Sequence, residues 1–395
     1  MLPEGWKNVQ LGEISKVTGG KRLPKGGVLV SHDTGYPYIR VTDMLDGGVC
    51  ISNIKYVPEN LSKAIEKYRI FKDDLFITVA GTIGVIGSIP DELNGANLTE
   101  NADRISEIKA NKIFLMEFLR SPFIQSYIEN VKTNNAQPKL ALEQIRTFPI
   151  LLPPLPEQKK IAAILSTWDR AIEGTEKLLA NSQQQKKALM QQLLTGKKRL
   201  PGFTGEWKLS PISAFIKESR ISGSSGDVAN KITIKLYGRG VIPKEEKREG
   251  SESTKYYKRK SGQFIYSKLD FLNGAFGIIP TTLDGYESTL DLPAFDFLHN
   301  VSSQWFIFYV SREEFYSANL GLANGGRKAR RVNPSDLLRI SVPTPSLSEQ
   351  KAIAAVLTTA DEEITALESD LTRLRQEKKA LMQQLLTGKR RVTVD

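Results

Sequence analysis

The residues that could do chemistry in this chain are few and are poorly placed for catalysis. Pro90-Asp91 followed by Glu107-Ile108-Lys109 matches the loose spacing of metal-dependent nucleases, in which two carboxylates and a lysine bind Mg²⁺ and activate water. This pattern is short, arises often by chance in charged chains, and has no counterpart in the second half of the chain. A self-contained nuclease is therefore an alternative, which cutting of DNA with Mg²⁺ alone would reveal.

Other catalytic signatures are missing from the sequence. The two histidines, His32 and His299, lie in unrelated settings, which argues against a histidine metal site or a catalytic triad. There is no Walker loop, AGTIGVIG at 80–87 lacks the GxGxxG spacing, and NPSD at 333–336 falls short of the Asn-Pro-Pro-aromatic motif of aminomethyltransferases. We therefore expect a non-catalytic chain that binds no metal or cofactor itself.

Cationic and amide side chains on glycine-bearing loops suit contact with DNA. Lysine and arginine neutralise phosphates, arginine reads guanine, and Asn or Gln pairs with adenine. The candidates in the first half of the chain are Lys21, Arg22, Lys25, Arg40, Thr82, Asn134, Gln137 and Lys139. Those in the second half are Lys235, Arg239, Lys268, Arg327, Lys328, Arg330 and Arg331. For each of them the alternative is an ordinary solvated turn.

Two of these loops occupy corresponding places in the two halves. TNNAQPKL at 133–140 and NGGRKARRV at 324–332 each come shortly before the last predicted strand of their half. This correspondence favours a shared role. We interpret the basic triplets at 197–199 and 389–391 instead as helix-end charges.

The bulk composition agrees with a polyanionic partner. The chain has 395 residues, with 55 Lys and Arg against 44 Asp and Glu, a net charge of +11. Such an excess favours nucleic acid first and an anionic membrane surface second. One cysteine, Cys50, excludes an intramolecular disulfide, and neither a signal pattern nor an apolar span is present, so we expect a cytoplasmic protein.

The strongest feature of the sequence is an internal repeat. LPEQKKIAAIL at 155–165 matches LSEQKAIAAVL at 347–357, and KKALMQQLLTGKKR at 186–199 matches KKALMQQLLTGKRR at 378–391. Both pairs are offset by 192 residues, while the regions between them diverge almost completely. The predicted layout is a variable region at 1–152, a repeat at 153–199, a variable region at 200–344 and a repeat at 345–395.

Each repeat is predicted to be one long helix with a heptad seam. Glu-Gln in the first turn and a glycine near 196 or 388 suit the start and stop of such a helix. The seam alternates by four and three residues, which is typical of helices that pair with each other. Its apolar positions are Ile161, Leu165, Trp168, Ile172, Leu179, Leu189 and Leu193 in the first copy, and Ile353, Leu357, Ile364, Leu371, Leu381 and Leu385 in the second.

The direction of the paired helices follows from chain length. A helix of about 38 residues is roughly 57 Å long. A domain of about 145 residues has a radius of gyration of only about 15 Å, so its two ends cannot join the far ends of parallel helices. We therefore predict antiparallel helices related by a pseudo-two-fold axis.

This arrangement resembles the specificity subunit of type I restriction-modification systems, through the twice-repeated EQxxIAxxL start and KKALMQQLLTGK end. The resemblance covers essentially the whole chain. It implies an α+β fold, with two target recognition domains linked by two long antiparallel coiled-coil helices.

The resemblance also implies partners. Each recognition domain would read one half of a bipartite, asymmetric site in double-stranded DNA, and the helices would set the spacer and bind two methyltransferase subunits. Those subunits would use S-adenosylmethionine to methylate adenine N6, and two restriction subunits would use ATP and Mg²⁺. A coiled-coil assembly protein that does not touch DNA is a further alternative, which salt-sensitive duplex binding would exclude.

Overall fold

The structure is a computed structural model that describes residues 2–132, 138–245, 250–318 and 331–393. The chain forms two compact units. The first contains Met1–Glu176 and Ser369–Asp395, and the second contains Lys177–Glu368. Each unit thus holds one globular domain together with half of each long helix.

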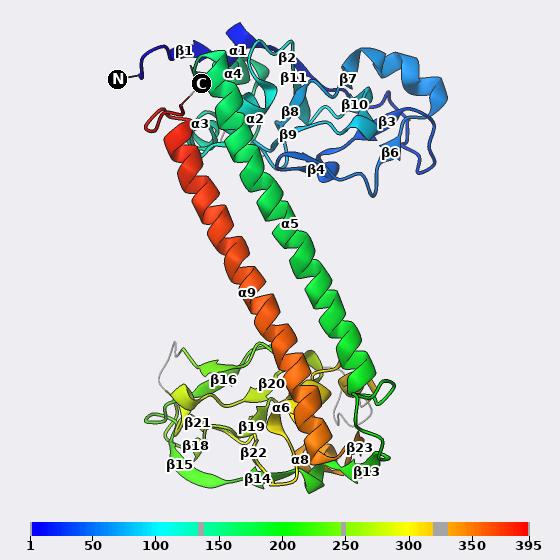
Figure 1. Ribbon diagram of the computed structural model, residues 1–395, viewed down its shortest axis with the longest axis vertical. Coiled ribbons are helices and arrows are strands. Elements are labelled where there is room, and N and C mark those ends of the chain that lie inside the picture. Colours follow the sequence, from blue (N-terminus) through cyan, green and yellow to red (C-terminus); the bar gives the residue numbers. More distant parts are fainter. Residues whose placement is uncertain (1, 133–137, 246–249, 319–330, 394–395) are drawn as a thin grey trace. The chain divides into compact units, whose positions relative to one another are not determined.

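The first unit is built on a four-stranded antiparallel sheet. The strand order is β2-β11-β8-β9, and a second four-stranded sheet of shorter strands, in the order β6-β3-β10-β7, belongs to the same domain (Figure 1). The strands of this unit are β1 (Lys7–Gln10), β2 (Lys16–Gly19), β3 (Pro37–Ile39), β4 (Met44–Leu45), β5 (Gly48–Val49), β6 (Lys55–Tyr56), β7 (Arg69–Ile70), β8 (Leu75–Thr78), β9 (Ile86–Ser88), β10 (Ala96–Leu98), β11 (Ala102–Ser106) and β12 (Pro149–Leu152). Its short helices are α1 (Leu11–Ile14), α2 (Lys112–Arg120), α3 (Pro122–Val131) and α4 (Leu142–Arg146).

The second unit repeats this framework with a different sequence. Its main sheet is again antiparallel and four-stranded, in the order β14-β22-β19-β20. The strands are β13 (Lys208–Pro211), β14 (Ile216–Ser219), β15 (Ile221–Ser225), β16 (Ile232–Ile234), β17 (Val241–Pro243), β18 (Lys255–Lys258), β19 (Phe264–Tyr266), β20 (Phe276–Ile278), β21 (Glu287–Ser288), β22 (Ala294–Phe297) and β23 (Ser341–Thr344). The short helices are α6 (Ser303–Val310), α7 (Glu313–Ala318) and α8 (Pro334–Arg339).

The first and last strands of each domain pair with each other. β1 pairs antiparallel with β12, and β13 pairs antiparallel with β23. The chain therefore enters and leaves each domain at one place, as antiparallel long helices require. Buried apolar runs explain the central strands: all residues of β8 and of β19 are buried.

The long helices are α5 (Leu155–Leu193) and α9 (Leu347–Leu385), and the predicted antiparallel direction is confirmed within each unit (Figure 1). In the first unit, Lys378 Nζ donates to Asp169 Oδ1 at 2.6 Å. In the second, Ser182 Oγ donates to Glu363 Oε1 at 2.8 Å, and Lys186 pairs with Asp361. The predicted seam residues are buried or half-buried along both helices.

The ends of the long helices belong to the domain cores. Ile161 and Leu165 of α5 and Leu385 of α9 pack in the same core cluster as the strands and helices of the first domain. Leu193 and Leu357 do the same in the second. Helix and domain are therefore one packed body at each of these junctions, rather than a domain on a flexible linker.

Duplicated side-chain anchors explain the repeated glutamate. Glu157 accepts a bond from Trp6 Nε1 at 3.3 Å and one from Arg391 Nε at 3.0 Å. In the second unit, Glu349 accepts from Trp207 Nε1 at 3.1 Å and from Arg199 Nη2 at 2.7 Å. The last residue of each basic triplet, Arg199 or Arg391, is therefore a structural partner of these glutamates.

The repeated glutamine tethers a neighbouring helix start. Gln158 Oε1 accepts from the backbone N–H of Asn111, the N-cap residue of α2, at 2.8 Å. Gln350 Oε1 accepts from Ser302, the N-cap residue of α6, at 2.9 Å. Because this bond orients a short helix against a long one, it explains a repeated residue that the heptad seam does not require.

The repeated glycines end the helices. Gly196 and Gly388 have left-handed φ angles of +73° and +71°, a conformation that favours glycine. A Cβ atom on them would lie 3.4 Å from the ring of Trp207 and 3.6 Å from the ring of Trp6, respectively. Helix termination and tryptophan packing thus coincide at both sites.

Candidate nucleic-acid interface

In the first domain, several predicted contact residues meet at the end of β8. The backbone N–H of Leu140 donates to the Val79 carbonyl at 3.0 Å, and Ala80 and Lys139 form an antiparallel bridge. The loop that follows β8 carries Thr82. Lys139 and Thr82 therefore flank one edge of the main sheet, although the sequence separates them by more than fifty positions.

The arginine loop at 20–27 is tied to the same edge. Arg22 Nε donates to Glu100 Oε1 at 2.6 Å, and the next residue, Asn101, accepts the Val79 N–H at 2.8 Å through its carbonyl. Although burial alone would raise it, the pKa of Glu100 is held below its usual value by the bond from Arg22. The Arg22 side chain itself is 78% exposed, so its remaining N–H groups face solvent.

The two lysines of this loop differ in their surroundings. Lys21 Nζ lies 5.7 Å from the centroid of the Tyr68 ring, in a cation–π contact. Lys25 is exposed within the turn closed by the bond from the Gly27 N–H to the Pro24 carbonyl, 2.9 Å long. Only Lys25 is thus free to reach a phosphate without giving up a contact of this kind.

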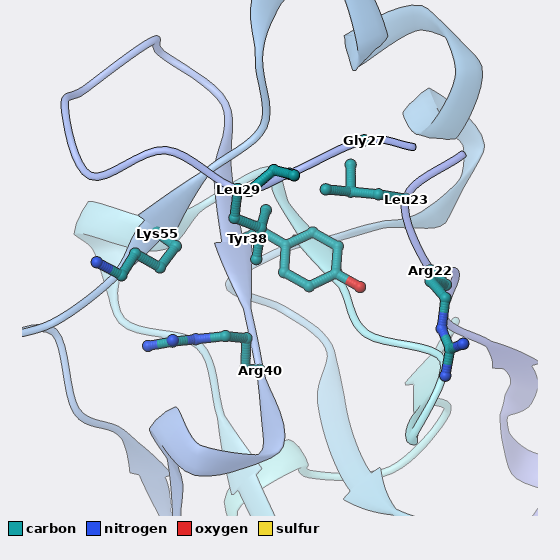
Figure 2. Close-up of a pocket in the computed structure, with 8 residues that line it drawn as sticks. Arg22, Leu23, Gly27, Leu29, Tyr38, Arg40 and Lys55 are labelled. Carbon is teal, nitrogen blue, oxygen red and sulfur yellow. The ribbon is translucent and has the colours of Figure 1, made fainter. Parts of the chain in front are cut away.

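A shallow pocket of about 410 Å³ lies between this loop and β3 (Figure 2). Its apolar lining comes from the Leu23, Leu29 and Tyr38 side chains, and its cations are Arg22, Arg40 and Lys55. Figure 2 shows the Tyr38 ring in the centre of the pocket, with its hydroxyl directed toward the side where Arg22 lies. An apolar floor with cations at its rim suits a nucleotide better than it suits a neutral apolar molecule.

Arg40 is fixed in place at this pocket. Its Nε and Nη2 donate to the two oxygens of Asp43 at 2.9 and 2.7 Å, and Nη2 also donates to the Asn53 carbonyl at 2.9 Å. These bonds raise the pKa of Arg40 above its ordinary value. Asp43 is buried, so the guanidinium is presented in one orientation, which suits directional recognition of a base edge or a phosphate.

In the second domain the chain returns to the main sheet in the same way. The Val332 N–H donates to the Lys268 carbonyl at 2.9 Å, and the Tyr266 hydroxyl donates to the Val332 carbonyl at 3.0 Å. Arg331 Nη1 lies 3.7 Å from Asp291 Oδ1, and the Lys268 N–H donates to the Asp291 carbonyl at 2.9 Å. Lys268 and Arg331 therefore gather beyond β19, as Thr82 and Lys139 do beyond β8.

The hairpin between β16 and β17 adds further cations to this edge. Lys235 and Arg239 are exposed on its loop. The backbone N–H groups of Tyr237 and Gly238 donate to the carbonyls of Asn273 and Gly274, at 2.9 and 2.8 Å. Because residues 267–275 also carry Lys268, the hairpin and the β19–β20 loop form one basic edge.

Five predicted contact residues lie outside the described residues and stay predictions: Asn134, Gln137, Arg327, Lys328 and Arg330. The turn LYGRG carries Tyr237 between Lys235 and Arg239, and its aromatic residue among cations is visible in the sequence. Sequence analysis overlooked Lys55, which lines the pocket beside Arg40. Lys55 is brought to Arg40 only by the pairing of β3 with β6.

The carboxylates of the nuclease-like pattern are engaged elsewhere. Asp91 Oδ1 lies 3.4 Å from Lys72 Nζ, and Glu107 Oε1 lies 3.0 Å from Lys16 Nζ. Within the described ranges, no group of three or more His, Cys, Asp or Glu residues could hold a metal ion. In the same ranges, no helix is long and apolar enough to cross a membrane. The NPSD segment begins α8, with Asn333 as its N-cap residue and Pro334 in its first turn.

The comparisons with known proteins agree with this architecture. The family described as "Type I restriction modification DNA specificity domain" matches residues 3–181. The type I restriction enzyme MjaVIII specificity subunit of Methanocaldococcus jannaschii is 25% identical over 427 residues, which cover 99% of this chain and 94% of that protein.

Solved structures share the fold. A chain from a study of complex assembly and conformational transition of the type I R-M system has a TM-score of 0.60 at 17% identity, covering 99% of this chain and 100% of that chain. The S subunit of the type I restriction-modification system from M. genitalium has a TM-score of 0.59 at 14% identity, covering 98% of each chain. Residues 3–181 thus match a type I restriction modification DNA specificity domain, and over nearly its whole length the chain is similar to type I specificity subunits and shares their fold.

Proposed function

We propose that this chain is the DNA-reading specificity subunit of a type I restriction-modification complex, with each domain reading one half of a bipartite, asymmetric target. The observation that carries the proposal is the pair of basic edges, built at the same place on the same sheet framework from unlike residues. Thr82 and Lys139 flank the edge beyond β8, and Lys268 and Arg331 flank the edge beyond β19. Equal frameworks with unlike contact residues suit two half-sites of different sequence.

The repeated helices support binding of two copies of one kind of partner, which we propose to be methyltransferase subunits. Residues that are identical between the two copies are exposed as well as buried. The exposed identical pairs on the long helices are Lys159 and Lys351, Ala163 and Ala355, Thr167 and Thr359, Glu176 and Glu368, Gln184 and Gln376, Lys187 and Lys379, Ala188 and Ala380, Gln191 and Gln383, and Gln192 and Gln384. Packing within this chain does not require exposed residues to be identical in the two repeats. Two equivalent contacts with the same kind of partner do require it.

The exposed identical residues fall into one group in each unit. The ion pair of Asp169 with Lys378 puts Thr167 of α5 at the level of Ala380 of α9, both in the first unit. The pair of Lys186 with Asp361 does the same for Ala188 and Thr359 in the second unit. One partner subunit for each unit is the stoichiometry that this repetition favours.

We further propose that the chain does no chemistry itself. Methylation of adenine N6 with S-adenosylmethionine would be carried out by the methyltransferase subunits. Two restriction subunits would supply ATP-driven cleavage with Mg²⁺. The paired helices would set the spacer between the half-sites, and the complex would work in the cytoplasm of a prokaryotic cell, where the DNA is.

The proposal is tested by duplex binding of the chain assembled with its methyltransferase subunits. We expect affinity to fall steeply with salt, because phosphate contacts release counterions. Replacing Lys268 and Arg331 with Ala should weaken binding about tenfold or more at one half-site and leave assembly intact. The matched control replaces with Ala two exposed lysines of the same domain outside this edge, Lys208 of β13 and Lys217 of β14. Binding that is insensitive to salt, or cutting of DNA by the isolated chain with Mg²⁺, would reject the proposal.

A further inference from the structure

Tyr237 occupies a backbone conformation that disfavours tyrosine. Its φ is +60°, in the left-handed region where glycine is the usual residue. The two hydrogen bonds from Tyr237 and Gly238 to the carbonyls of Asn273 and Gly274 hold the turn in this shape. Gly274 must itself be glycine, because its φ is +70° and a Cβ there would approach Tyr237 Cα to 3.1 Å.

The fold gains little from the tyrosine side chain. The side chain is 74% exposed, and within the described residues no hydrogen bond or ring contact involves it. A glycine would relieve the backbone and cost the core nothing, since the ring is not part of a core cluster. Strain of this kind persists where the side chain serves a contact outside the folded chain.

The surroundings indicate what that contact is. Lys235 and Arg239 lie two residues to either side of Tyr237, and both are exposed. Lys268 is on the loop to which the hairpin is bonded. An aromatic face between cations fits a base flanked by phosphates, because the ring can stack on the base while the cations neutralise the backbone.

We propose that Tyr237 stacks on, or wedges against, a base of the half-site read by the second domain, with Lys235 and Arg239 on the flanking phosphates. This inference rests on the proposed function, because it requires the second domain to bind DNA. It adds a contact that recognises the shape and stacking of the DNA rather than hydrogen bonds at base edges. The strained turn fixes the backbone that carries the ring, so little backbone entropy is lost at this turn on binding.

The proposal is tested with variants of the full chain, each assembled with the methyltransferase subunits. Binding is measured to a DNA duplex that carries the sequence that this assembly methylates. Tyr237→Ala should weaken binding about tenfold, the range expected for loss of one base–aromatic stack, and should leave the salt dependence unchanged. Tyr237→Phe should bind within about twofold of the unmodified chain, because stacking needs the ring and not the hydroxyl. Lys235→Ala and Arg239→Ala should instead each reduce by about one the slope of the logarithm of the binding constant against the logarithm of the salt concentration.

Two further measurements separate stacking from a structural role. Tyr237→Gly should bind as weakly as Tyr237→Ala while its thermal unfolding midpoint is unchanged or higher, because glycine relieves the strained φ. With 2-aminopurine placed in turn at each position of the half-site, the unmodified chain should change the fluorescence at one position, and Tyr237→Ala should abolish that change. The control Val228→Ala, at a residue of the same domain that is 68% exposed, should have no effect.

The proposal is overturned if Tyr237→Ala binds the target as tightly as the unmodified chain. It is also overturned if the variant loses methyltransferase subunits at unchanged DNA affinity, since the ring would then contact protein. Both results require that the unmodified assembly binds duplex DNA. Failure of that binding itself would count against the proposed function, so the two failures are distinguishable.

Discussion

Asp103 illustrates how a single buried carboxyl can link the stability of the first domain to pH. It lies on β11 between Gly19 of β2 and Ile77 of β8, and it is 5% exposed. Burial raises its pKa to about 6, and the nearby charge of Arg146 only partly opposes this. An acid with a raised pKa binds its proton more tightly in the folded chain than in the unfolded one.

The sign of the effect on stability follows directly. Below a pH of about 4 the carboxyl is protonated in both states and costs nothing. Between about 4 and 6 the unfolded chain ionises first, so the free energy of unfolding falls as pH rises. Above a pH of about 6 the carboxyl is ionised in both states, so its contribution to the free energy of unfolding no longer changes with pH.

We predict that Asp103→Asn stabilises the protein more at pH 8 than at pH 4.5, because Asn carries no charge at either pH. The increase in the free energy of unfolding should be larger at pH 8 than at pH 4.5 by about 1–2 kcal/mol. Urea unfolding of both chains at each pH measures it, with Glu92→Gln, a substitution of an exposed carboxyl, as control. Equal gains at the two pH values would show that Asp103 is not held protonated by burial.

At the scale of residues, sequence analysis could find exposed cations that are candidates for DNA contact. It could not find the carboxylates with which those cations pair. Arg22 and Arg40 were recognisable as cations on or beside glycine-bearing loops. Their carboxylate partners, Glu100 and Asp43, follow from how strands pack and could not be inferred from spacing alone. Asp103 gave no signal, because its burial depends on the neighbouring strands β2 and β8.

At the scale of elements, the two long helices carry equivalent ion pairs in unequal surroundings. Lys378 pairs with Asp169 at 2.6 Å and also lies 2.8 Å from Glu117, a fully buried side chain of α2. Lys186 pairs with Asp361, whose side chain is 43% exposed. The Nζ atom of Lys186 also lies 5.6 Å from the centroid of the Phe308 ring. The Lys378–Glu117 pair is therefore buried, whereas the Lys186–Asp361 pair is half-buried and is accompanied by a cation–π contact.

These surroundings predict different costs for the same substitution. Lys378→Ala should lower the free energy of unfolding by about 3 kcal/mol, because Glu117 loses a buried partner. Lys186→Ala should cost about 1 kcal/mol, since solvent replaces its partner. Denaturant unfolding of both variants measures the difference. Equal costs, or a larger cost at Lys186, would contradict this description of the junctions.

The helices were the most predictable elements of the fold. Heptad spacing and the 192-residue offset led to two long helices and to their antiparallel direction, because both follow from periodicity and chain length. The strands were less predictable, because most have only two to five residues. The repeated Glu157 and Gln158 were recognised only as a helix start, whereas they also anchor Trp6 and the α2 N-cap.

At the scale of the whole molecule, the proposed role of the helices is to set the distance between two half-sites. Inserting seven residues after Gly174 and seven after Arg373 keeps the heptad register of both helices. Each helix should lengthen by about 10 Å, or about three base pairs of DNA. We predict that the spacer of the recognised site lengthens by a similar amount.

The control for this experiment inserts seven residues into α5 alone. One inserted heptad would put Asp169 and Lys378 out of step with Lys186 and Asp361, so we expect loss of activity rather than a new spacer. Mapping of methylated sites in cells that carry each variant reports both results. An unchanged spacer in the double insertion would contradict the role of the helices as a ruler.

Whole-molecule layout was predictable where the chain repeats itself, and the identity of the target was not. A duplicated framework gives two compact units and, in our proposal, two equivalent partner surfaces. The bases that each edge reads depend on side-chain geometry at loops such as 79–85 and 267–275, which differ in sequence and length. No residue code links such loops to bases.

The most direct test of the central proposal is sequencing of methylated adenines in a host that carries the methyltransferase subunits, with and without this chain. We predict methylation that depends on the chain, at one asymmetric sequence split into two half-sites by an unspecified spacer. In the variant with Lys268 and Arg331 replaced by Ala, specificity should relax in one half-site only. Methylation that does not require the chain, or a target that is one uninterrupted sequence, would contradict the account.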